Sequence, residues 1–173
     1  HIIPDIVLFL NGLPIVVVEA KSPKVSEPLS EAIDQLMRYS EQRGDTGEGN
    51  PALFQYNQFL IVTCRNEAKA GTITTHREKY FYRWTDPYPM TLNDLTHGQS
   101  APNDQQRLVA GMLSLQNLLD IIRIFTIFSI NDKGKKIKIV CRYQQFRAVK
   151  KMVKRLQKGK TKEDRGGILW HTQ

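Results

Sequence analysis

The sequence has little cysteine, no long apolar run and no glycine-rich phosphate loop. Its 2 cysteines, Cys64 and Cys141, exclude a disulfide framework and offer no zinc-ligand spacing. No segment approaches the roughly 18 consecutive apolar residues that a membrane span needs, and the start at His1 has no signal-peptide pattern. We therefore expect a cytoplasmic protein without a membrane partner. The sequence G-x-x-x-x-G-K-[ST] is also absent, so we expect no ATP hydrolysis by these residues alone.

Acidic residues are scarce in the last quarter of the chain, and this scarcity explains the net charge of +8. Residues 1–130 have 11 Lys and Arg against 14 Asp and Glu, whereas residues 131–173 have 14 against 3. A pI near 9.6 favours a nucleic-acid partner. The count by segment assigns the basic excess to the C-terminal end and leaves the first 130 residues slightly acidic.

Two short apolar runs, residues 6–10 and 15–18, flank the dipeptide Asn11-Gly12. Both residues of an Asn-Gly pair tolerate the positive φ angles of a tight turn, so the pattern predicts a β-hairpin. Because the two runs are apolar at every position, we expect this hairpin to be buried on both faces at the centre of a mixed sheet.

The chain between this hairpin and residue 130 alternates helix and strand patterns, which predicts an α/β (α+β) fold with a sheet flanked by helices. A helix over residues 28–43 begins at Pro28 and stops before Gly44. The other predicted elements are a strand over 59–63, strands over 72–75 and 79–84, a short helix capped by Thr91 or Asn93, one or two helices over 104–122 with Leu108, Met112, Leu115 and Leu119 inward, and an extended segment over 125–128.

The last quarter has a different pattern. Residues 131–136 are charged and contain glycine, so we expect a linker there and a division into domains 1–130 and 131–173. Residues 142–158 form a basic amphipathic helix with 7 Lys and Arg, which either face solvent or contact phosphate. Its apolar face comprises Phe146, Val149, Val153 and Leu156. Residues 166–173 have the pattern of a buried strand that is only beginning.

The residues that could bind a metal ion or take part in catalysis lie around the first hairpin. Asp5 and Glu19 lie seven residues to either side of Gly12, so an antiparallel hairpin brings both to its open end. Lys21 follows Glu19 by two residues and therefore lies on the same face of the strand. Two carboxylates and a backbone carbonyl, that of Ala20, are ligands that Mg²⁺ prefers. Bound Mg²⁺ lowers the pKa of a water molecule and neutralises charge on a scissile phosphate. Lys21 would either orient that water or stabilise the pentacovalent phosphorane.

The following helix adds Gln35 and Tyr39, which are four residues apart and share one helix face beside the apolar stripe. This pair could contact a phosphate or a base near the metal, or it could do ordinary packing. Likewise Asp5 could be a turn residue, and Glu19 and Lys21 a solvated strand end. Burial of three unpaired charges would be expensive, and this favours the functional interpretation.

A family resemblance covers essentially the whole chain. Residues 4–21, Pro-Asp-Ile-Val-Leu-Phe-Leu-Asn-Gly-Leu-Pro-Ile-Val-Val-Val-Glu-Ala-Lys, resemble the PD-(D/E)xK nuclease core of the restriction (R, HsdR) subunit of type I restriction-modification enzymes. The segment Gln35-Leu-Met-Arg-Tyr39 is similar to the Q-x-x-x-Y motif of that family. The segments 53–63, 71–74, 143–149 and 165–173 are similar to it as well.

The resemblance implies that Asp5 and Glu19 bind Mg²⁺, that Lys21 is the catalytic lysine, and that Gln35 and Tyr39 engage DNA. It implies non-specific cleavage of double-stranded DNA after ATP-driven translocation, with the methyltransferase (M) and specificity (S) subunits as partners.

The resemblance also places the chain within a longer subunit. In the family, the segment similar to residues 166–173 leads directly into the ATP-binding loop of a helicase-like translocase, so this loop would follow Gln173 and no ATP-binding residue is expected within the chain itself. The family also has an acidic residue upstream of the Pro-Asp pair. We therefore expect this chain to be an internal fragment that does not necessarily cut DNA alone.

Other candidate residues have simpler interpretations. Cys64 ends an apolar strand and is expected in the core. Tyr80, Tyr82 and Trp84 alternate along a predicted strand and either stack on bases or pack on a neighbouring element. The histidines have no metal-like spacing, and no metal role is expected for His1, His76, His97 or His171.

Three function classes stay open at this point: the nuclease part of an ATP-dependent restriction subunit, a repair or recombination nuclease of the same fold without a motor, and a non-catalytic DNA-binding module.

Overall fold

The turn at Asn11 and Gly12 joins the first two strands of the sheet. The computed structural model describes residues 2–44, 47–75, 77–96 and 100–170. In it β1 (Ile6–Leu10) and β2 (Leu13–Ala20) are antiparallel, and the two turn residues have φ angles of 49° and 81°. The predicted hairpin is therefore confirmed.

Only one strand of this hairpin is central. The strand order is β1-β2-β3-β4, so β1 is an edge strand, and within the described part of the chain it pairs with β2 alone. Phe9 is 61% exposed, whereas Val16 and Val17 of β2 are fully buried. The prediction that both strands are buried on both faces is wrong for β1, because an edge strand has no neighbour to cover its outer side and a register shift interrupts its pairing between Leu8 and Phe9.

Helix α1 (Pro28–Tyr39) connects β2 to the parallel strand β3 (Phe59–Cys64), with a 3₁₀ turn, η1 (Pro51–Phe54), before β3. Pro28 begins the helix as predicted, since its fixed φ suits the first turn. The helix ends four residues earlier than predicted, because Glu41 adopts a φ of 56° and the Gln42 amide donates to the Met37 carbonyl.

The flank of the sheet differs from the sequence prediction. The fourth strand is β4 (Glu67–Gly71), antiparallel to β3, whereas residues 72–75 form a turn and Glu78–Tyr80 form a 3₁₀ turn, η2. The strand predicted over 72–75 is therefore wrong. Of the segment predicted as a strand over 79–84, Tyr82 alone pairs with the sheet among the described residues, through two backbone hydrogen bonds of 2.9 Å with Ala70. The Glu-Ala-Lys-Ala-Gly segment has low β propensity, but Ala68 and Ala70 are small enough to be buried under the helices.

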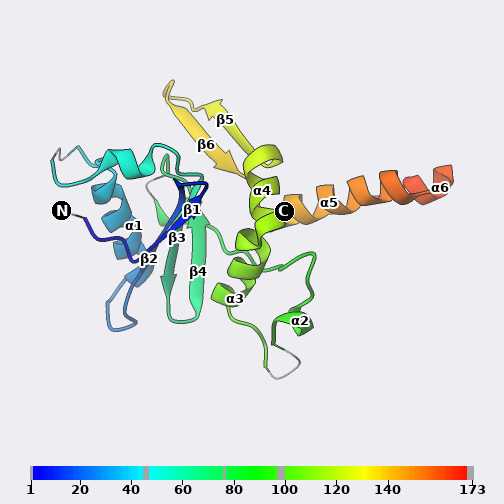
Figure 1. Ribbon diagram of the computed structural model, residues 1–173, viewed down its shortest axis with the longest axis horizontal. Coiled ribbons are helices and arrows are strands. Elements are labelled where there is room, and N and C mark those ends of the chain that lie inside the picture. Colours follow the sequence, from blue (N-terminus) through cyan, green and yellow to red (C-terminus); the bar gives the residue numbers. More distant parts are fainter. Residues whose placement is uncertain (1, 45–46, 76, 97–99, 171–173) are drawn as a thin grey trace.

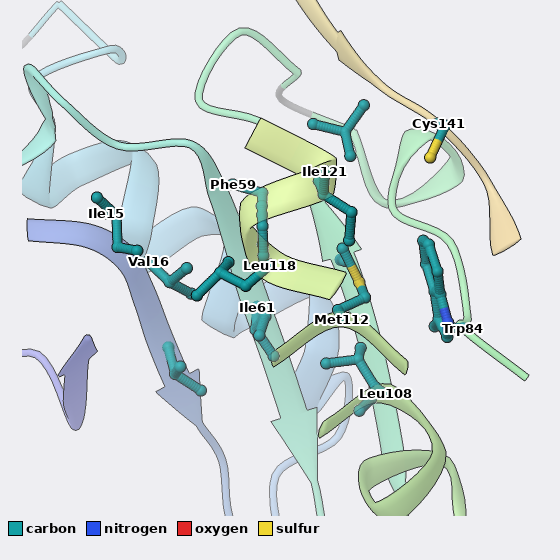
Figure 2. Packing of buried hydrophobic residues seen from close by; sticks show 14 of the residues in the cluster. Ile15, Val16, Phe59, Ile61, Trp84, Leu108, Met112, Leu118, Ile121 and Cys141 are labelled. Atoms are coloured by element: carbon teal, nitrogen blue, oxygen red, sulfur yellow. The ribbon is translucent and has the colours of Figure 1, made fainter. Parts of the chain in front are cut away.

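Hydrophobic side chains cover both faces of the sheet. On one face, Val17 and the alternate residues of β3 pack against the apolar stripe of α1. On the other, residues of β2 and β3 such as Val16 and Ile61 pack against the helical segment that includes Met112 (Figures 1 and 2). The buried residue Trp84 extends this second cluster. The molecule therefore has a layer of helix on each side of the sheet, as predicted.

The segment over residues 92–124 contains α2 (Leu92–Thr96), α3 (Asp104–Leu108), a π-helical turn η3 (Val109–Leu113) and α4 (Leu115–Ile124). Thr91 precedes α2 and its hydroxyl accepts from the Asp94 amide at 3.3 Å, as predicted. Leu108 and Met112 are buried as predicted, but Leu115 is exposed and Leu118 is buried in its place. The π turn shifts the helical phase, which a 3.6-residue period cannot anticipate.

The C-terminal quarter starts with a second, two-stranded sheet, in which β5 (Thr126–Ile130) is antiparallel to β6 (Lys136–Val140). Residues 131–135 form the turn of this hairpin, closed by the Asn131 amide donating to Lys135, so the predicted linker is wrong. Helix α5 (Tyr143–Lys158) follows and extends away from the sheet (Figure 1), and α6 (Lys162–Arg165) is a single turn.

The apolar face of α5 is only partly covered. Phe146 is buried in the same cluster as Val16 and Ile61, whereas Val153 and Leu156 are exposed. Among the helices that the structure describes, none is long and apolar enough to cross a membrane.

The end of the chain differs from the sequence prediction in its described part. Residues 166–170 are extended without strand partners and exposed, so the strand predicted over 166–173 is absent from these five residues, because no neighbouring strand offers its backbone groups there. Gln173, after which the ATP-binding loop is expected, lies outside the described residues together with residues 171 and 172. The position of that loop therefore stays a prediction.

Candidate active site

Asp5 lies at the open end of the β1–β2 hairpin, opposite the end of β2. Its Oδ2 accepts a hydrogen bond of 2.7 Å from the backbone N–H of Ala20, fifteen residues along the chain. The pairing of Ile6 with Val18 sets this position, because one residue before Ile6 then faces the residues after Val18. The hairpin thus holds the Asp5 carboxylate beside Glu19, as the symmetric spacing around Gly12 predicts.

Glu19 is the most buried charged residue at this end of the sheet, with 2% of its surface exposed. It lies on the face of β2 that α1 covers, and its Oε1 is 3.3 Å from the Nζ of Lys21. Its other oxygen, Oε2, is buried and has no hydrogen-bond partner among the described residues. The solvated strand end that the sequence left as an alternative is therefore excluded for Glu19.

Lys21 connects the strand to helix α1. Its backbone N–H donates to the Thr63 carbonyl at 2.9 Å, which continues the pairing of β2 with β3 past Ala20. Its ammonium donates to Glu19 and to the Oε1 of Gln35, and it lies 3.9 Å from a carboxylate oxygen of Glu31. The lysine is thereby fixed by a strand on one side and a helix on the other.

Gln35 and Tyr39 extend this chain of hydrogen bonds along α1. The Nε2 of Gln35 donates to the Tyr39 hydroxyl, which donates in turn to the Ile3 carbonyl at 3.2 Å. Tyr39 is buried and Gln35 half-buried. Four of the predicted side chains therefore form one hydrogen-bonded chain, and Asp5 lies beside it, bonded to the Ala20 N–H. We call these five residues the carboxylate site: Asp5, Glu19, Lys21, Gln35 and Tyr39.

The environment of Glu19 raises the pKa of its carboxyl. Burial is the main cause, because it penalises the charged form, and the nearby Asp5 carboxylate adds repulsion. The Lys21 ammonium acts in the opposite direction without overcoming these two effects. A perturbed acid beside a second acid and a lysine is typical of a functional site.

The donor set fits a divalent cation that keeps several water ligands. The Oε2 of Glu19 has no hydrogen-bond partner among the described residues, and a cation between Glu19 and Asp5 would be a positive partner for both acids. Among the described residues, no group of three or more His, Cys, Asp or Glu side chains could hold a metal ion. Asp5 and Glu19 would therefore supply two carboxylates, and water molecules would complete the coordination, as is common for Mg²⁺.

Sequence reasoning missed Glu31 as a member of this neighbourhood. It precedes Gln35 by four residues, so helical periodicity could have found it. The four histidines lie outside the described residues, and the expectation of no metal role for them stays a prediction. Cys64 is buried in the core as predicted. Trp84 is also buried, which confirms packing rather than base stacking for this side chain.

The fold and the site define an α/β domain that gathers two acids and a lysine at the end of a buried strand in a mixed sheet. Residues 1–79 match the family described as the type I restriction enzyme R protein N terminus. This segment contains the whole carboxylate site. This N-terminal segment of the chain therefore matches the type I restriction enzyme R protein family, in agreement with the resemblance found in the sequence.

Similar proteins extend this match over the full chain. The chain is 33% identical over 174 residues to the type I restriction enzyme HindI endonuclease subunit of Haemophilus influenzae, covering 99% of this chain and 16% of that protein. It is also 33% identical over 176 residues to a protein of Methanocaldococcus jannaschii provisionally named the MjaVIIIP type I restriction endonuclease subunit, covering 100% and 15%. The chain thus spans about one sixth of the length of these relatives.

Proposed function

We propose that this chain forms a Mg²⁺-dependent nuclease domain with the PD-(D/E)xK fold, which hydrolyses phosphodiester bonds of double-stranded DNA within a type I restriction enzyme. The intact R subunit would cut non-specifically after ATP-driven translocation and would assemble with the M and S subunits. Residues 1–130 would carry the nuclease, and residues 131–173 would lead into the translocase, with its ATP-binding loop after Gln173. The names of the relatives, which are restriction endonuclease subunits, favour this class over a motor-less repair nuclease or a non-catalytic module.

One observation carries the proposal: the buried, unpaired Oε2 of Glu19 lies beside Asp5 and Lys21. If this position served only the stability of the fold, an apolar side chain would cost less free energy to bury than a carboxylate does. Its retention beside a second acid supports a role in holding a cation.

The residues would divide the work as follows. Asp5 and Glu19, with the Ala20 carbonyl, would hold Mg²⁺, which when bound lowers the pKa of a water molecule and neutralises charge on the phosphate. The Ala20 N–H already fixes the orientation of Asp5. The Lys21 ammonium, held between Glu19 and Gln35, would donate hydrogen bonds to the phosphate oxygens as their charge increases. Gln35 and Tyr39 would orient Lys21 and contact the DNA backbone.

The decisive experiment is restriction of an unmodified plasmid by the full complex with Lys21→Ala in the intact R subunit. We expect DNA cleavage to fall by a factor of about 100 or more, because a charge-stabilising donor is lost, while DNA-stimulated ATP hydrolysis persists. Persistent Mg²⁺-dependent cutting would show that the active site lies elsewhere. Lys24→Ala, in the exposed loop after β2, is the matched control and should cut normally.

A further inference from the structure

A groove lies between the sheet and the β5–β6 hairpin. It has a volume of about 550 Å³, with the turn over residues 72–75 on one side and β6 on the other. The hydroxyls of Thr72 and Thr74 donate to the Lys138 carbonyl at 3.0 and 3.3 Å, and the Lys138 N–H donates back to Thr74 at 3.0 Å. These bonds join the two walls, so the groove is built into the fold.

The charge of this groove is entirely positive. Its lining contains four cationic side chains and no Asp or Glu: Arg77, Lys133, Lys138 and Arg142. We call this set the basic groove. Over the residues that the structure describes, Arg77, Lys133 and Arg142 form no ion pair with a carboxylate. Lys138 is half-buried and donates to the Asn57 carbonyl rather than to an acid.

Basic side chains elsewhere in the described chain are often neutralised. Lys69 pairs with Glu78 at 2.6 Å, and Arg147 pairs with Asp86 at 2.6 Å. The cations of the basic groove thus leave an uncompensated positive potential, which attracts polyanions. An anion with several charges at regular spacing is the complementary ligand.

Aromatic and hydroxyl groups accompany the cations. Tyr82 lies under the Arg142 guanidinium, 5.9 Å from its ring centroid, and its hydroxyl donates to the Cys141 carbonyl at 2.8 Å. Tyr80 also lines the groove and is 53% exposed. A basic groove with aromatic side chains is typical of surfaces that follow a nucleic-acid strand.

The basic groove and the carboxylate site share no residue, and the groove lies toward the opposite end of the sheet. Glu19 pairs with Val62 and Val62 with Lys69, while the groove begins at Gly71, two residues further along β4. Strand spacing and rise place Gly71 roughly 12 Å from Glu19.

We propose that the basic groove binds the phosphate backbone of one DNA strand and so positions DNA relative to the carboxylate site. This inference rests on the proposed function for the identity of the nucleic acid. Arg77, Lys133 and Arg142 would contact successive phosphates, and the exposed Tyr80 would pack against a sugar or base. The groove would contribute affinity without sequence specificity, because phosphate contacts do not distinguish bases.

Binding of a fluorescent duplex to the intact R subunit tests this proposal in the absence of Mg²⁺, so that no cutting occurs. We expect Arg77→Gln and Lys133→Gln each to weaken binding by about threefold and to lower the slope of log affinity against log salt by about 0.9. The charge-preserving variant Arg77→Lys should retain the slope. Arg123→Gln removes an exposed cation of α4 outside the groove and should change neither quantity.

Two results would overturn the inference: an unchanged salt slope in both groove variants, or an equal loss in Arg123→Gln. The first result would also be the outcome if the groove served an acidic protein instead. A single-stranded probe distinguishes the form of DNA bound, since each contact then contributes a slope of about 0.7. If Lys21→Ala still cuts DNA but the groove variants lose binding, the nuclease assignment fails while the groove assignment stands.

Discussion

The carboxylate site and the basic groove are opposites in charge, burial and internal bonding. In the first, Glu19 is 2% exposed and every side chain is connected to another member or to a backbone group of the site. In the second, the guanidinium and ammonium groups of Arg77, Lys133 and Arg142 are exposed and lack carboxylate partners among the described residues. Residues 1–130, which contain the acids, are slightly acidic as a whole, and the basic excess lies after them.

This difference explains why the net charge of the chain does not indicate where the carboxylate site lies. A cation-binding site needs acids held close together at a cost in desolvation and repulsion, so it must be built into the core. Phosphate attraction works over longer distances through water and needs only exposed cations. The overall charge of +8 reflects the exposed cations that attract phosphate and does not indicate the buried acids that could bind a cation.

The largest effect that we expect tests whether the acidic and basic regions fold as one unit. Phe146 of the basic helix α5 is buried against Trp84 and Phe125, with ring centroids 5.7 and 4.9 Å away. Phe146→Ala should lower the free energy of unfolding by about 3–5 kcal/mol, because it leaves a cavity in the core that also packs on the sheet. Chemical denaturation of the chain, followed by tryptophan fluorescence, measures this loss.

Val153→Ala is the control on the same helix, because Val153 is exposed. It should change the free energy of unfolding by less than about 0.5 kcal/mol. A separate transition for α5, with the sheet unaffected by Phe146→Ala, would instead divide the chain into two domains near residue 131, as the sequence predicts.

The second prediction separates stability from function in the carboxylate site. Glu19→Gln should reduce DNA cleavage by the full complex by a factor of about 100 or more, as expected for loss of a group that stabilises the transition state. The free energy of unfolding should rise by about 1 kcal/mol, because a buried, partly unpaired carboxylate is replaced by a neutral amide. Plasmid cleavage and denaturation measure the two changes.

Glu31→Gln is the matched control, since Glu31 lies 3.9 Å from the same lysine but is mostly exposed. It should alter both quantities only slightly. If Glu19→Gln lowered stability and left cleavage intact, the acid would be a structural group and the site assignment would be wrong.

A smaller effect concerns the end of the hydrogen-bond chain on α1. Tyr39→Phe removes the hydroxyl that accepts from Gln35 and donates to the Ile3 carbonyl. We expect about 1 kcal/mol of stability to be lost and cleavage to fall by about tenfold, because Lys21 is less firmly oriented through Gln35. Tyr56→Phe, at an exposed tyrosine, should change neither. Equal cleavage by Tyr39→Phe and the wild type would limit Tyr39 to packing.

The elements that the sequence predicted correctly are those with strong local signals. The Asn11-Gly12 turn, the strand over 59–63 and the start of the helix at Pro28 have strong local signals. The strand β4 could not be found, because Ala68 and Ala70 are selected by close packing rather than by β propensity. The exposed Leu115 follows a π turn, and no local sequence pattern predicts that turn.

The members of the carboxylate site were predictable because two regular periods place them. The hairpin symmetry and the two-residue strand repeat locate Asp5, Glu19 and Lys21, and the four-residue helix spacing joins Gln35 to Tyr39. Their order along one hydrogen-bond chain depends on how α1 packs on β2, which is a tertiary property. The basic groove was missed for the same reason, since residues 71–82 and 131–142 meet only in the folded chain.

The smallest predicted effect concerns the ion pair that holds α5 to α4. Burial alone would raise the pKa of Asp120, but hydrogen bonds from Lys150, at 2.5 Å, and from Gln116 outweigh it, so the pKa of this carboxyl lies below its usual value. An acid whose pKa is lower in the folded state stabilises the fold at pH values above its unfolded-state pKa. This contribution is lost as the pH falls through the folded-state pKa. Asp120→Asn should therefore cost less than about 1 kcal/mol at pH 7, and the difference from wild type should vanish in acid below the pKa of the folded state. Denaturation across this pH range measures the difference. A gap that stayed constant with pH would mean that Asp120 acts through packing, and α5 would then be held to the acidic region by Phe146 and its apolar neighbours rather than by charge.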